Sequence, residues 1–136
     1  MTRRALLAGI AAAVTVAALS GCTLASAITP PVESALYPTT ADVGGKNGTI
    51  PIPSWVPADA VNVQIKKNNE TGASIMQFAE LTPTAIGAAC DASIAGNLPV
   101  LDDTWWPQTL PTEGVTCVDG WHVFVLGGIQ YFAWTP

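Results

Sequence analysis

Charged side chains are scarce in this 136-residue chain, where Asp, Glu, Lys and Arg make up only 11% of the residues, against about 25% in typical soluble domains. Basic side chains are the rarest, with five Lys and Arg against ten Asp and Glu, and the net charge is −5. Nucleic-acid binders present a basic face to the phosphate backbone, so we expect no nucleic-acid partner. The length allows one domain and excludes a large multidomain enzyme.

The signature motifs of common enzyme classes are also missing. The chain has no G-x-S-x-G elbow, no phosphate-binding P-loop and no glycine-rich dinucleotide fingerprint. Its one histidine, His122, and the lack of any C-x-x-C pair argue against a metal site. We therefore expect no enzyme activity, no cofactor and no metal, and we expect His122 to be a structural or solvent-facing residue of a strand.

The N-terminus carries a sorting segment. Arg3 and Arg4 precede an uncharged stretch over residues 5–19, which is shorter than the roughly 20 residues that a membrane-spanning helix needs. This pattern is typical of a cleaved signal peptide. The paired arginines also fit twin-arginine export, so that route and the general secretory route both stay open.

A short motif, Leu19-Ser20-Gly21-Cys22, closes this segment. It resembles the lipobox of bacterial lipoproteins, in which a branched aliphatic residue and two small residues precede a lipidated cysteine. The resemblance implies that residues 1–21 are removed and that Cys22 carries the lipid, holding the protein on the outer face of the cell membrane. The rest of the chain is similar to small lipoproteins of high-GC Gram-positive bacteria, a likeness that implies no activity.

Two segments follow the motif. Residues 22–49 are rich in Pro, Thr, Ala, Ser and Gly without a sustained period, which predicts a lipidated, flexible tether. Residues 50–136 are expected to form the extracytoplasmic domain. With Cys22 lipidated, Cys90 and Cys117 remain as a natural disulfide pair outside the cell, and closing a ring of about 28 residues stabilises a fold by about 3–4 kcal/mol.

The predicted fold class is α+β, with a small antiparallel sheet, one short helix and one disulfide. Residues 61–66 alternate apolar and polar side chains, and with residues 74–80 they predict an antiparallel hairpin. Thr82 and Pro83 resemble a helix N-cap and first residue. They predict an Ala-rich helix over residues 85–92.

A second hairpin is predicted at the C-terminus, where two apolar strands, residues 121–126 and 129–134, flank a pair of glycines. Two glycines suit the positive φ angles of a two-residue turn, and that turn would place Trp121 opposite Trp134. Both faces of the hairpin are mainly apolar, so we expect it to lie in the centre of the sheet.

The candidate contacts lie in a Pro-rich stretch, residues 97–114, which is predicted to be a long loop. It contains Asp102, Asp103, Trp105 and Trp106. Either both tryptophans close over a small core, or one faces solvent and binds a sugar ring or a protein partner.

The sequence therefore favours a membrane-anchored, non-enzymatic binding or interaction module of the cell envelope. Its contacts would be Asp102, Asp103, Trp105 and Trp106, and its partner an envelope protein or glycan. Three alternatives stay open. The first is an envelope enzyme acting on cell-wall sugar, which would use Asp102, Asp103 or Glu113, although adjacent carboxylates poorly suit the two sides of a glycosidic bond. The second is a prophage-type lipoprotein that blocks superinfection. The third is a purely structural accessory subunit.

Overall fold

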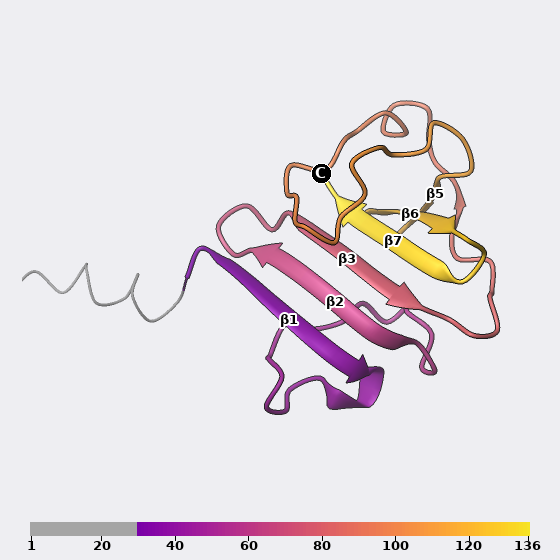
Figure 1. The fold of residues 1–136 in the computed structure, drawn as a ribbon. Coiled ribbons are helices and arrows are strands. Elements are labelled where there is room, and N and C mark those ends of the chain that lie inside the picture. Colours follow the sequence, from indigo (N-terminus) through magenta and orange to yellow (C-terminus); the bar gives the residue numbers. More distant parts are fainter. Residues whose placement is uncertain (1–29) are drawn as a thin grey trace, which may run out of the picture.

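One antiparallel sheet of seven strands organises the computed structural model, which describes residues 30–136 (Figure 1). The strands are β1 (Val32–Thr39), β2 (Val61–Asn68), β3 (Ser74–Ala79), β4 (Ala88–Ala89), β5 (Thr116–Val118), β6 (Trp121–Leu126) and β7 (Gln130–Thr135). Their order across the sheet is β1-β2-β3-β7-β6-β5-β4. Within the described part of the chain the one helical element is a short 3-10 turn, Thr40–Asp42. These residues therefore contain no helix that is long and apolar enough to cross a membrane. The predicted signal peptide and the predicted lipidation site, Cys22, lie outside the described residues.

Strand β1 corrects the expected tether. It pairs with β2 along its length, and Tyr37 is fully buried, with its hydroxyl donating to the Ile50 carbonyl over 2.9 Å. From Val32 onward the expected tether over residues 22–49 is therefore wrong, because Val32–Thr39 form a strand of the sheet and a 3-10 turn, Thr40–Asp42, follows directly. Prolines around β1 obscured the strand, yet proline is compatible with a sheet edge, where a backbone donor can be spared.

The helix predicted over residues 85–92 is also wrong. This stretch is extended, and its strand β4 pairs with β5 so that Ala88 lies opposite Cys117. Helix propensity is a weak preference that tertiary contacts override, and here strand pairing and a disulfide act on the same segment. The fold is consequently mostly β rather than α+β.

The two predicted hairpins are present, but the second has a different register. β2 and β3 pair antiparallel, as do β6 and β7. Leu126 pairs with Gln130, so the C-terminal turn contains three residues rather than two. The shift of one residue puts His122, instead of Trp121, opposite Trp134.

Each face of the sheet carries its own core. On one face the buried cluster is covered by residues 50–60, and its members include Tyr37, Val63, Ile65, Met76, Phe78 and Tyr131. On the other face the cluster is covered by the irregular segment that precedes β5, and it consists of Ile75, Trp106, Phe124, Phe132 and Trp134. The expectation that the C-terminal hairpin lies in the centre of the sheet is confirmed, because β7 and β6 lie between β3 and β5. The long loop over residues 97–114 is confirmed as well, since it contains no strand or helix.

The predicted disulfide is confirmed. Cys90 and Cys117 are bonded across a sequence separation of 27 residues, with their α-carbons 4.9 Å apart. The bond ties the end of β4 to the middle of β5. It therefore fixes the two ends of the irregular segment that covers the second core.

Gly87 is predicted to be essential for the packing of β4. Its φ is +76°, and a β-carbon there would lie 2.6 Å from the Cys117 carbonyl oxygen. Gly72 has a similar φ of +82°, but a β-carbon added there would meet nothing within 4 Å, so it provides a matched control. Gly87→Ala should lower the free energy of unfolding by about 2–5 kcal/mol, through strain and overpacking, and Gly72→Ala by about 1–2 kcal/mol. Urea unfolding measures both; equal losses would show that Gly87 does not pack as described.

Candidate functional site

The tryptophan pair expected to bind a ligand mainly closes the second core. Trp106 is 6% exposed and packs edge-on against Phe132, Phe124 and Trp134, with ring centroids 5.8–6.4 Å apart. Trp105 meets Trp106 in the same edge-on manner at 5.9 Å and stays half-buried. Trp106 therefore offers almost no surface to a ligand, and Trp105 offers part of one.

The acidic pair beside them anchors the loop to the sheet. The Lys66 ammonium on β2 donates to the Asp103 carboxylate over 3.1 Å and to the Asp102 carbonyl over 2.8 Å. The hydrogen bond from Lys66, followed by that from the Thr104 amide, lowers the pKa of Asp103. Asp103 thus remains ionised at neutral pH, which suits an ion pair and does not suit a proton donor. The Asp102 side chain is exposed.

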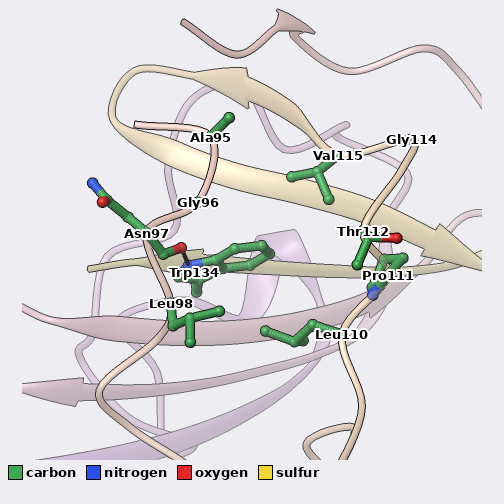
Figure 2. Close-up of a pocket in the computed structure, with 10 residues that line it drawn as sticks. All are labelled: Ala95, Gly96, Asn97, Leu98, Leu110, Pro111, Thr112, Gly114, Val115 and Trp134. Carbon is green, nitrogen blue, oxygen red and sulfur yellow. Dashed lines mark hydrogen bonds between the residues drawn. The ribbon is translucent and has the colours of Figure 1, made fainter. Parts of the chain in front are cut away.

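A groove that the sequence did not reveal lies between the two ends of this loop, on the same face of the sheet (Figure 2). Two chain segments, residues 95–98 and 110–115, form its walls, and Trp134 of β7 lies at its base. Its volume is about 320 Å³, and ten residues line it: Ala95, Gly96, Asn97, Leu98, Leu110, Pro111, Thr112, Gly114, Val115 and Trp134.

Side chains of the sheet hold the first wall by its backbone carbonyls. The Trp134 indole N–H donates to the Asn97 carbonyl over 3.1 Å (Figure 2), and the His122 Nε2 lies 2.8 Å from the Ile94 carbonyl. The preceding turn adds bonds from the Ala95 amide to the Asp91 carbonyl at 2.9 Å and from the Asn97 amide to the Ile94 carbonyl at 2.9 Å. Together with the disulfide, these bonds give the groove a defined shape without a bound ligand.

The groove is chemically simple. Leu98, which is 69% exposed, and Leu110 supply aliphatic surface on the two walls. Within the described residues that line the groove there is no carboxylate, histidine or thiol. Both leucines stand directly before a proline, and this repeated Leu-Pro pair is the sequence signal that could have pointed to an apolar contact in the loop.

A buried polar cluster around Glu80, away from the groove, was not expected from the sequence. Glu80 is 1% exposed, and its carboxylate accepts hydrogen bonds from the Thr84 amide and hydroxyl at 3.1–3.3 Å. The Tyr131 hydroxyl donates to the Thr84 carbonyl over 2.7 Å. Burial and the nearby Glu80 raise the pKa of Tyr131, so this phenol stays protonated and acts as a donor that fixes the turn after β3.

One group of side chains in the described residues could ligate a metal ion. The ligand atoms of Cys90, Cys117 and His122 lie within 4.8 Å of one another. In the disulfide form the two sulfur atoms are bonded to each other, so the thiolates that a metal needs are not free.

Comparisons of the chain with protein-family models, curated proteins and solved structures find no match. The candidate site therefore depends on its own geometry.

The two neighbouring tryptophans should differ in their effect on stability. Trp106→Ala removes a buried ring from the second core and should lower the free energy of unfolding by about 3–5 kcal/mol. Trp105→Ala removes a half-buried ring and should cost roughly half as much. Urea unfolding followed by tryptophan fluorescence tests this difference, and a larger loss for Trp105→Ala would contradict the packing described.

Proposed function

We propose that the protein is a lipid-anchored, extracytoplasmic binding module whose contact surface is the groove above Trp134. The lipobox-like residues 19–22 support the anchor, and the disulfide between Cys90 and Cys117 supports an oxidising compartment. The observation that carries the proposal is the groove itself, a preformed apolar depression between two walls that are tied to the sheet.

An apolar segment of an envelope protein is the ligand that this groove suits best. A volume of about 320 Å³ is at the small end of the range for ligand sites, which is enough for one or two aliphatic side chains. Sugar recognition relies on an exposed aromatic face, and Trp134 at the base is only 2% exposed. Leu98 and Leu110 instead offer the aliphatic surface that a protein partner buries.

An enzyme acting on cell-wall sugar has less support. Such an enzyme needs two carboxyl groups on opposite sides of the scissile bond, roughly 5–9.5 Å apart. Asp103 is engaged by Lys66, and Asp102 and Glu113 are exposed side chains outside the set that lines the groove. A superinfection-blocking lipoprotein would be a special case of the same binding role.

A photo-crosslinking amino acid placed at Leu98 should capture the partner in cells. Leu36 on β1 is the matched control, because it is 54% exposed but lies outside the lining of the groove. We expect a discrete adduct from position 98 whose mass lysozyme leaves unchanged, and none of that mass from position 36. Equal adducts from both positions would contradict the groove as the contact, and an adduct whose mass falls after lysozyme treatment would show a glycan partner instead.

Lipidation is tested separately. Cys22→Ala should move the protein from the membrane fraction to the soluble or secreted fraction, because the thiol that takes the lipid is gone. Ser26→Ala, four residues further on, is the control and should leave the protein in the membrane fraction. Membrane retention of the Cys22→Ala protein would contradict the anchor.

A further inference from the structure

We propose that the reduced protein has a metal site, in which Cys90, Cys117 and His122 bind a divalent ion of zinc-like chemistry. The site lies on the sheet next to the first wall of the groove, where His122 contacts the Ile94 carbonyl, and it does not need a ligand in the groove. It exists only when the disulfide is open, so it gives the protein a second, redox-dependent binding function.

Strand pairing brings the three residues together. Cys117 and His122 are directly opposite each other in the β5–β6 ladder, and the disulfide shows that Cys90 reaches Cys117. The two sulfur atoms and a ring nitrogen of His122 lie within 4.8 Å of one another. Zinc bonds of about 2.3 Å to sulfur and 2.0 Å to nitrogen place these ligand atoms roughly 3.5–3.8 Å apart in a tetrahedron. Side-chain rotations that move these atoms by about 1 Å therefore suffice.

The tautomer of His122 supplies the nitrogen lone pair. Its Nε2 lies 2.8 Å from the Ile94 carbonyl oxygen, which can only accept a hydrogen bond, so Nε2 carries the hydrogen. In this tautomer the lone pair is on Nδ1. That atom has no hydrogen-bond partner among residues 30–136, and the side chain is 1% exposed. A buried, unsatisfied acceptor is costly, and a metal bond would satisfy it.

The surroundings of His122 match those of a metal-bound histidine. Metal-bound histidines commonly donate their second ring N–H to a carbonyl or carboxylate, which fixes the ring orientation, and the Nε2 bond to Ile94 has this form. Trp134 stacks on the imidazole with ring centroids 4.7 Å apart and planes inclined by 16°. In the oxidised protein the ring is thus already held in the orientation that a metal bond would need.

The chemistry balances with a dithiol as the reductant. Thiol–disulfide exchange transfers two electrons to the Cys90–Cys117 bond, giving two protein thiols while the dithiol closes to its own disulfide. A zinc ion then displaces the two thiol protons and binds both thiolates and the Nδ1 lone pair. Two thiolate charges cancel the charge of the ion. The fourth position of the tetrahedron stays open to water or another ligand.

Cobalt(II) titration of the reduced full chain tests the site, because cobalt occupies zinc sites. Its absorption bands show whether thiolates are bound to the metal and whether the coordination is tetrahedral. The protein is reduced with a dithiol, freed of reductant without oxygen and titrated, and zinc is then added to displace the cobalt. We expect one cobalt ion per chain, with sulfur-to-cobalt charge-transfer bands and tetrahedral d–d bands, and no such bands from the oxidised protein. Reduced protein without these bands would overturn the proposal.

His122→Gln is the decisive variant. Its amide can still donate to the Ile94 carbonyl but has no imidazole lone pair, and circular dichroism of the oxidised variant checks that it folds. The reduced variant should bind zinc at least about tenfold more weakly than the reduced parent protein. Equal affinities of the two would overturn the proposal. So would equal zinc affinity of the reduced parent protein with and without denaturing urea, because binding would then be that of an unfolded dithiol.

Discussion

The disulfide between Cys90 and Cys117 is the constraint on which the face of the sheet with the second core depends. Between these cysteines the described chain has no regular element except the start of β5, so this segment cannot position itself by helix or ladder hydrogen bonds. The sheet positions it instead, through the disulfide at its ends and through His122, Trp134 and Lys66, which bind backbone carbonyls along the way. Trp106 then packs beneath the loop as its apolar anchor.

This arrangement links stability to the proposed binding role. A groove made from irregular backbone keeps its shape only if that backbone is fixed, since an ordering cost paid at binding would weaken the affinity. Here Trp134 both holds the wall and belongs to the second core, so the contact surface and the fold share this residue. His122 lies between the wall and the disulfide, and a change in the redox state of the cysteines would therefore reach the groove.

Local patterns in the sequence were sufficient to predict the β2–β3 pair, the C-terminal hairpin and the disulfide. The two hairpins follow from alternating side chains and paired glycines, which act over short distances, and the disulfide follows from the number of cysteines. Long-range effects were not accessible. The Ala-rich stretch over residues 85–92 predicts a helix, but pairing with strand β5 makes part of it a strand. The composition around β1 predicts a tether, but burial of Tyr37 holds this segment in the sheet. The one-residue register shift brings His122 opposite Trp134. It depends on the conformation of the turn, so the presence of two glycines does not predict it.

Amide hydrogen exchange tests the central claim that the sheet fixes the groove wall through the disulfide. The Ala95 and Asn97 amides donate to the Asp91 and Ile94 carbonyls, and the β3 amide of Met76 serves as the internal reference. The account predicts protection of Ala95 and Asn97 in the oxidised protein and its loss in the reduced, metal-free protein, while Met76 stays protected. Free exchange at Ala95 and Asn97 in the oxidised protein, or unchanged protection after reduction, would contradict it.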